Sequence, residues 1–102
     1  MAVAFVQEFP IQTRETTNYD AIAERLDASD DPPEGLILHT AGFDDQAGVF
    51  RIFDVWETQE QCDRFQAERV MPLVEEIVFA ADPGAARPSR NDYYALHDVI
   101  RG

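Results

Sequence analysis

The feature that most constrains the fold is a pair of neighbouring apolar segments, LILHTAGF at 36–43 and GVFRIFDVWE at 48–57, joined by the short polar stretch DDQA. Two such runs around a short polar connection are typical of an antiparallel β-hairpin. Side chains alternate between the two faces of a strand, so a hairpin with one wet face should alternate apolar and polar residues. Here both faces carry apolar residues, which predicts a sheet that is covered on both sides.

Local signals along the rest of the chain supply the elements around this hairpin. β-Branched and aromatic residues predict a first strand that Pro10 stops, because proline lacks the N–H that a ladder needs. Thr17 followed by Asp20 marks a helix start, and DYYALHDVI predicts a final strand. The predicted order is a strand at 3–9, a helix at 17–27, the hairpin, a helix at 58–77 and a strand at 92–100.

The second helix has the clearest start signal and an expected interruption. TQEQ at 58–61 matches the capping-box pattern, and apolar residues continue at helical spacing as far as Ile77. Pro72 lies inside this stripe, where it removes a hydrogen-bond donor and crowds the preceding turn. We therefore expect a kink or a restart of the helix near Met71.

The order β-α-β-β-α-β predicts a ferredoxin-like α+β fold, with a four-stranded antiparallel sheet and both helices on one face. At 102 residues the chain is expected to form a single domain spanning residues 1–102. Nothing in that length remains to cover the second apolar face of the sheet. We therefore predict a homodimer in which two sheets pack face to face.

Charge and cysteine content limit the partners and the compartment. Twenty acidic residues against eight basic ones give a net charge of −12, which repels phosphate backbones and anionic lipid surfaces. We expect no nucleic-acid and no membrane partner. The single cysteine excludes an internal disulfide, the first ten residues do not resemble an export signal, and no apolar run is long enough for a membrane span. A cytoplasmic protein is predicted.

The segments GLILHTAG at 35–42, DVWETQEQCDRF at 54–65 and YYALHDVI at 93–100 resemble the dimeric α+β barrel superfamily, in particular the antibiotic-biosynthesis-monooxygenase-like proteins. The resemblance covers essentially the whole chain and rests on the element order and on a strand ending in Trp56 that runs directly into a capped helix. It implies a dimeric barrel and chemistry such as cofactor-independent oxygenation of aromatic phenols, heme degradation, isomerisation or ring closure. The chain looks most like members without an assigned activity.

One pair of residues could carry chemistry. Counting outward from DDQA pairs Phe43 with Gly48 and His39 with Ile52, so His39 and Asp54 are expected as diagonal neighbours on one face. A buried carboxylate needs a donor, and His39 is the nearest one that the sequence supplies. A histidine oriented by a carboxylate could act as a general base toward an acidic phenol or enol. The alternative is a polar pair that only holds the strand register.

Four further residues are candidates for contact with a ligand. The aromatic side chains Phe50, Trp56 and Phe65 could line a pocket between sheet and helices, or could simply fill the core. His97 lies on the predicted last strand, with no signal that fixes its face. Cys62 begins the second helix without a base beside it in the sequence, and we expect a structural role for it.

Two hypotheses from different classes remain open. The first is a small-molecule-binding dimer that acts on aromatic or polyketide-like substrates as a cofactor-independent monooxygenase or cyclase, with His39 as the base and Asp54 as the group that orients it. The second is a non-catalytic ligand carrier or accessory protein. No cofactor and no metal are expected, since the sequence has neither a glycine-rich nucleotide loop nor clustered metal ligands. The heme-degrading branch relies on an asparagine and a histidine that this chain lacks at the corresponding positions.

Overall fold

The computed structural model describes residues 1–102. Four strands form one antiparallel sheet in the order β2-β3-β1-β4. The elements are β1 (Val3–Pro10), α1 (Thr17–Leu26), β2 (Leu36–Asp44), β3 (Val49–Trp56), α2 (Gln59–Phe65), η1 (Gln66–Val70), α3 (Met71–Val74), η2 (Glu75–Phe79) and β4 (Arg90–Ala95).

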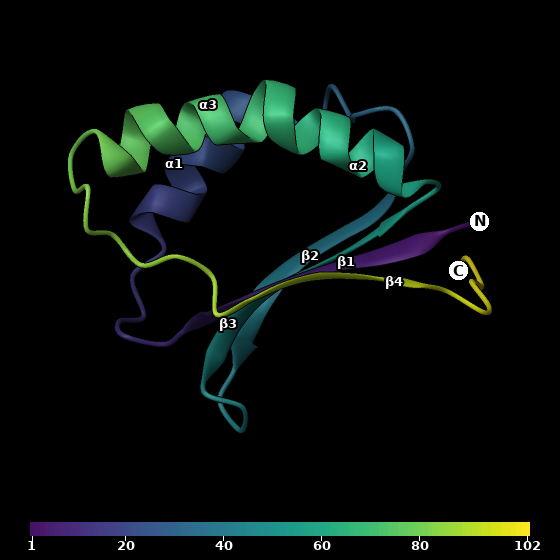
Figure 1. The fold of residues 1–102 in the computed structure, drawn as a ribbon, viewed down its shortest axis with the longest axis horizontal. Coiled ribbons are helices and arrows are strands. Elements are labelled where there is room, and N and C mark those ends of the chain that lie inside the picture. The colour runs from purple at the N-terminus through teal and green to yellow at the C-terminus, as the bar shows by residue number, and fades with distance from the viewer.

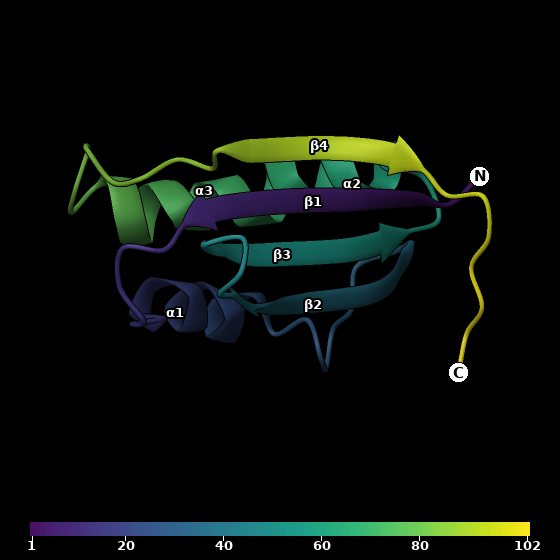
Figure 2. The same ribbon diagram turned by 90° about the horizontal axis from the view of Figure 1, so that it is seen from below.

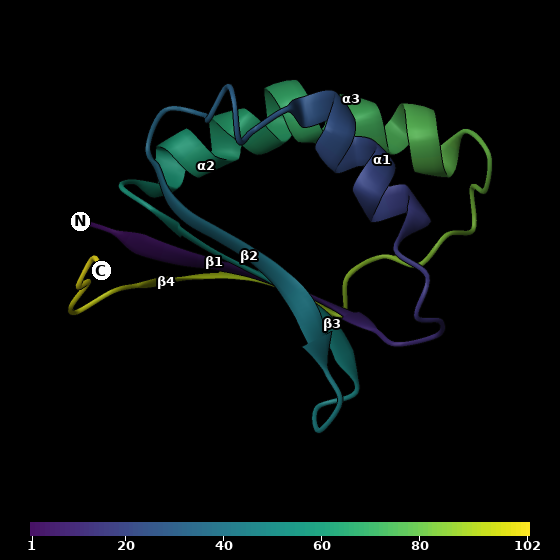
Figure 3. The ribbon, with the colours of Figure 1, turned by 180° about the vertical axis from the view of Figure 1, so that it is seen from behind.

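All helices lie on one side of the sheet (Figure 1), and the view from below shows the four strands with the helices behind them (Figure 2). The view from behind shows α1 beside α3, on the same side of the sheet (Figure 3). The predicted ferredoxin-like fold is confirmed. None of the helices is long and apolar enough to cross a membrane.

The hairpin register differs from the prediction by two residues. The loop is Asp45–Gly48 instead of 44–47, so Phe43 pairs with Phe50 and His39 pairs directly with Asp54. Gly48 has φ +71°, a left-handed conformation that suits a turn and that glycine adopts without strain. The Asp44 side chain accepts the backbone N–H of Ala47 at 3.1 Å, which closes the turn from the other end.

A bulge near the start of β2 also changes the pairing. Leu36 pairs with Trp56 while Leu38 pairs with Val55, so Ile37 is the extra residue. As a result, Leu36 packs against the core cluster on the side of the helices.

The last strand is shorter than predicted, because its neighbour ends. β4 stops at Ala95, which pairs with Val3 at the start of β1. One more hydrogen bond, from the backbone N–H of Leu96 to the carbonyl of Ala2 at 2.9 Å, closes the ladder. His97 therefore lies beyond the sheet and is exposed, which corrects its predicted position on the strand.

The second helical region starts and breaks where the sequence predicts. The Thr58 hydroxyl accepts the backbone N–H of Gln61 at 3.2 Å and caps α2. A wider π-helical turn, η1, then ends at Val70, and α3 restarts at Met71 with Pro72 in its first turn. The missing N–H of proline explains why the regular helix is interrupted at this point.

The register defines two faces of the sheet. The inner face points toward the helices, and its best-buried part is a cluster of Phe5, Trp56 and Cys62 of α2. The outer face carries the alternate residues. The inner-face residues are Val3, Phe5, Gln7 and Phe9 on β1, Leu36, His39, Ala41 and Phe43 on β2, Phe50, Ile52, Asp54 and Trp56 on β3, and Asn91, Tyr93 and Ala95 on β4.

Candidate functional site

A histidine and a carboxylate face each other across β2 and β3. His39 and Asp54 are direct cross-strand partners on the inner face, and His39 Nδ1 lies 2.6 Å from Asp54 Oδ1. Asp54 is 4% exposed, whereas the His39 side chain remains 41% exposed. The carboxylate of Asp54 is thus enclosed, whereas the imidazole bonded to it is accessible to solvent.

The second oxygen of Asp54 is also occupied. Trp56, two residues along β3 and on the same face, directs its indole Nε1–H to Asp54 Oδ2 at 3.3 Å. Because indole can only donate, this contact fixes Asp54 Oδ2 as an acceptor. Both oxygens of the buried carboxylate therefore accept hydrogen bonds, which lowers the cost of burying its charge.

These contacts set the protonation pattern of His39. An ionised Asp54 can only accept, so His39 Nδ1–H donates to it and Nε2 carries the free electron pair in the neutral ring. The hydrogen bond with Asp54 is the main cause that raises the pKa of His39, and partial burial opposes it. A raised pKa makes Nε2 a better proton acceptor than that of an isolated histidine.

Tyr19 on α1 completes this chain of hydrogen bonds. Its hydroxyl lies 2.6 Å from His39 Nε2, so in the tautomer described above the tyrosine donates to the histidine. Burial is the largest cause that raises the pKa of Tyr19, followed by the charges of Asp54 and Asp20. Tyr19 was not singled out from the sequence, where it shares a helical stripe with the apolar residues Ile22 and Leu26. A polar aromatic residue on such a stripe is the one signal that could have drawn attention to it.

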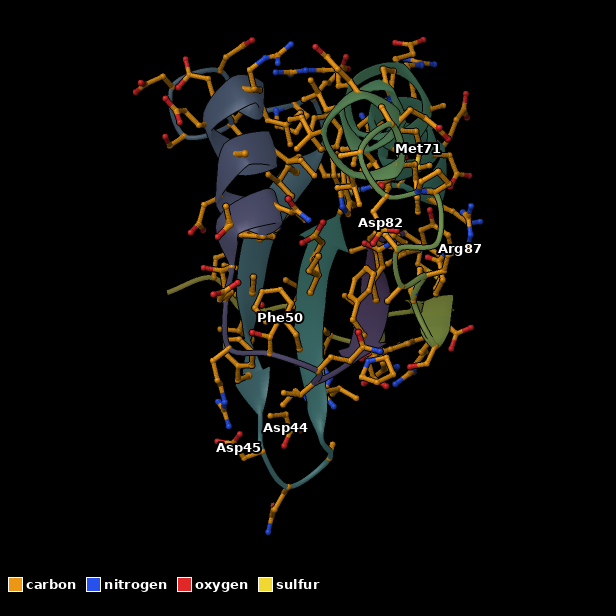
Figure 4. The ribbon with its side chains drawn as sticks, turned by 90° about the vertical axis from the view of Figure 1, so that its left-hand side faces the viewer. Asp44, Asp45, Phe50, Met71, Asp82 and Arg87 are labelled. Atoms are coloured by element: carbon orange, nitrogen blue, oxygen red, sulfur yellow. The ribbon has the colours of Figure 1, made fainter.

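A group of aromatic rings extends from Tyr19 toward the tip of the hairpin. Phe50 lies with its ring centroid 5.6 Å from that of Tyr19 and 4.9 Å from that of Phe43, both in edge-to-face geometry. The guanidinium of Arg14 covers the Phe43 ring at 4.8 Å. Figure 4 shows Phe50 below α1, between that helix and the hairpin tip where Asp44 and Asp45 lie. The predicted ligand contact Phe50 therefore lies against Tyr19, the residue whose hydroxyl bonds to the candidate base.

Much of the inner face beside these rings is only half-buried. Gln7, Phe9 and Ile52 all keep part of their surface accessible, although helices lie over this side of the sheet. The helices α1, η1, α3 and η2 contribute no fully buried residue. Partly open apolar and aromatic surface next to a few polar groups is the usual character of a small-molecule site.

Comparison with known proteins was informative only at the level of structure. No family model and no curated protein matches the sequence. SnoaB, a cofactor-independent oxygenase from Streptomyces nogalater, superposes with a TM-score of 0.64 at 16% identity, over 99% of this chain and 98% of its own. The two chains therefore share one fold.

Two further structures agree with this result. Rv0793 from Mycobacterium tuberculosis has a TM-score of 0.64 at 14% identity, over 99% of this chain and 100% of its own. A protein from Caulobacter crescentus, provisionally assigned to the antibiotic biosynthesis monooxygenases, has a TM-score of 0.67 at 9% identity, over 95% of this chain and 91% of its own. The likeness expected from sequence is confirmed for the fold.

The remaining predicted contacts lie apart from the accessible side of His39. Trp56 is 0% exposed and reaches the site only through its bond to Asp54. Phe65 packs against the Trp56 ring at 5.5 Å and lies under Arg69, on the other side of the core cluster. His97 lies past the end of β4.

A second polar group lies on the inner face near β4. The Tyr93 hydroxyl donates to Asp63 and approaches Cys62 Sγ at 3.6 Å. Burial raises the pKa of the Cys62 thiol to about 12, and the thiol is 0% exposed. A thiol in this state is a poor nucleophile, in agreement with the structural role expected for it. No group of three or more His, Cys, Asp or Glu side chains could hold a metal ion.

Proposed function

We propose that this protein binds a hydroxylated aromatic small molecule between the inner face of the sheet and α1, and that His39 Nε2 removes a proton from it. The observation that carries the proposal is the pair of His39 and Asp54. The carboxylate is buried and doubly hydrogen-bonded, while the imidazole it orients stays partly accessible and contacts Tyr19, whose ring packs on Phe50. An oriented histidine of raised pKa, next to aromatic surface, suits proton abstraction from a phenol or enol.

The reaction class that we propose is oxygenation without a cofactor. His39 takes a proton from the substrate, and the resulting anion supplies electrons to O2. For an anthrone, the CH2 group becomes C=O with one oxygen atom of O2, and the other oxygen atom leaves as water with the two hydrogen atoms. Four electrons pass from substrate to oxygen, so no further reductant is required. The likeness in fold to SnoaB, named as a cofactor-independent oxygenase, supports this class.

Turnover of candidate anthrones and hydroxyquinones tests the proposal. Oxygen consumption and quinone formation should occur with the wild type and fall by at least about a hundredfold in His39→Ala, the usual scale for loss of a general base. His97→Ala is the matched control, because His97 is the only other histidine and lies beyond β4. Equal rates in His39→Ala and wild type would contradict the proposal. Binding without any turnover would favour the carrier hypothesis.

We also propose that two copies pack through their outer faces. At one end this face presents Leu38, 49% exposed, and Tyr94, 45% exposed, on either side of the small residues of β1 and β3. At the other end Arg51 bonds to Glu8 and Asp44, each at 2.7 Å. An apolar area beside charges that are already paired suits a self-complementary contact.

Sedimentation at micromolar concentration tests this dimer. The wild type should sediment as a dimer, and Leu38→Glu should shift it toward monomer because burying an unpaired charge costs roughly several kcal/mol. Met71→Glu is the control, since Met71 is a comparably exposed apolar residue, 40%, on the helical layer. A monomeric wild type would contradict the proposal.

A further inference from the structure

The nitrogen of His39 that should accept a proton is already occupied. Tyr19 Oη lies 2.6 Å from Nε2, so an incoming substrate meets a histidine with both ring nitrogens hydrogen-bonded. Proton transfer from a substrate to His39 then has two routes. Either the Tyr19 hydroxyl passes the proton on, or it leaves and the substrate takes its place.

The contacts of Tyr19 describe the group that this place accepts. Its ring is nearly parallel to the imidazole of His39, at 8° and 6.3 Å between centroids, and packs edge-to-face on Phe50. The phenol group of Tyr19, with its hydroxyl on Nε2 and its ring against Phe50, occupies the position that a hydroxylated aromatic ligand would take. The site is thus already shaped for an aryl hydroxyl group, and Tyr19 supplies one from within the chain.

Apart from the contacts of Tyr19 itself, the helix α1 is anchored at its far end. Arg69 donates to the backbone carbonyl of Leu26 at 2.7 Å, which anchors the last turn of α1. At the first turn no side chain caps the helix, and the Thr16 hydroxyl donates to the side chain of Asp20. No residue of α1 is fully buried. The end that bears Tyr19 can therefore move at low cost, since few buried contacts oppose it.

We propose that Tyr19 is an internal substitute for the substrate hydroxyl, and that an aryl hydroxyl ligand displaces it from His39 Nε2 as the first turn of α1 swings out. This inference rests on the proposed function and names the ligand class and the gate of the same site. Tyr19 is a specificity residue here, because it weakens every ligand that cannot replace its hydrogen bond. The apparent affinity is reduced by the fraction of molecules in which Tyr19 occupies the nitrogen.

Displacement is favoured over relay by the surroundings of Tyr19. A relay through this hydroxyl develops negative charge on Tyr19, close to the charges of Asp54 and Asp20. Those charges and the partial burial raise the pKa of Tyr19, which disfavours its ionised form. The neutral hydroxyl is a good hydrogen-bond donor to Nε2 and can be exchanged for another donor.

Binding of 4-nitrophenol tests the inference without requiring turnover. This probe is an aryl hydroxyl compound whose ionised form absorbs visible light, so one titration reports both binding and proton transfer to the protein. At a pH below the pKa of the probe, Tyr19→Phe should bind it roughly threefold to tenfold more tightly than wild type, the worth of one hydrogen bond. The ionised fraction at saturation should not fall.

Tyr93→Phe is the matched control. It removes a hydroxyl from the same face of the sheet, but that hydroxyl contacts Asp63 and Cys62 instead of His39. Its affinity for 4-nitrophenol should equal that of wild type. If Tyr19→Phe does not fold, the wild type gives a second measurement, because amide hydrogen exchange at residues 17–20 should accelerate when the probe saturates the site. Slower exchange there would overturn the proposal.

The outcomes separate this inference from the proposed function. Equal or weaker binding by Tyr19→Phe overturns displacement, and loss of probe ionisation in that variant points to relay. In both cases a loss of turnover in His39→Ala would leave the proposed function intact. Absence of binding in wild type and Tyr19→Phe alike overturns the inference, and equal turnover in His39→Ala and wild type overturns the proposed function alone.

Discussion

Replacing Asp54 with asparagine should reverse the tautomer of His39. The carboxylate of Asp54 accepts two hydrogen bonds, from His39 Nδ1 and Trp56 Nε1. An asparagine offers one acceptor oxygen, which must face Trp56 because indole can only donate. Its NH2 group then faces His39 Nδ1 and requires it to accept, so the ring proton moves to Nε2. In Asp54→Asn the proposed base nitrogen is therefore blocked.

The cost in stability can be worked out from these two contacts. Hydrogen bonds to a charged group contribute about 1.5–3 kcal/mol, against about 1 kcal/mol for neutral pairs. Because the His39 side chain is 41% exposed, solvent screens that bond, and we expect Asp54→Asn to lose about 1 kcal/mol. Asp54→Ala should lose about 3 kcal/mol, since it also leaves the buried indole N–H of Trp56 unpaired and opens a cavity.

Urea unfolding measures these losses, because Trp56 is the only tryptophan and its fluorescence reports on this site. In a domain of this size 1 kcal/mol corresponds to a fall of about 4–8 °C in Tm. Proton abstraction from 4-nitrophenol should be lost in Asp54→Asn although the protein stays folded. An unchanged urea midpoint together with full ionisation of the probe would refute the role assigned to Asp54.

Three further predictions concern the same region. The hydrogen bond that His39 donates to Asp54 raises the folded-state pKa of His39. Its contribution to stability is therefore present below the unfolded-state pKa and is lost as pH rises through the folded-state pKa. The difference in urea midpoint between wild type and His39→Gln should shrink as the pH rises through that range. Trp56→Phe should lower the free energy of unfolding by about 2 kcal/mol, because it leaves a gap in the core and removes the donor to Asp54. Urea unfolding followed by circular dichroism measures this loss. A thiol reagent should label Cys62 only at the rate of unfolding, since burial raises its pKa to about 12, and fast labelling of the native protein would contradict this.

The order of the elements follows from local sequence signals, because each start and stop has its own chemistry. Thr58 caps α2 through its own side chain. Pro72 interrupts the second helical region because proline has no backbone N–H to donate. The hairpin register depends on one finer choice, namely whether Gly48 lies in the strand or in the turn. Its positive φ places it in the turn, and a shift of one loop residue moves the pairing by two. The face shared by His39 and Asp54 survives such a shift, since side chains alternate with period two.

What sequence could not predict depends on contacts between distant elements. Tyr19 lies twenty residues before His39, and only the packing of α1 over the sheet brings them together. Whether His97 lies in a strand depends on where β1 begins, because β4 cannot extend past its partner strand. Neither relation leaves a local pattern in the sequence.

Nitrogen-15 NMR of the two imidazole rings is the most direct test of His39 as an oriented base. Above the pKa of His39, we predict a proton on Nδ1 and a bare Nε2, with exposed His97 as an internal reference that averages between tautomers. The same spectrum of Asp54→Asn should show the proton on Nε2. A wild-type His39 that carries its proton on Nε2, or that averages like His97, would contradict the assignment of this nitrogen as the proton acceptor.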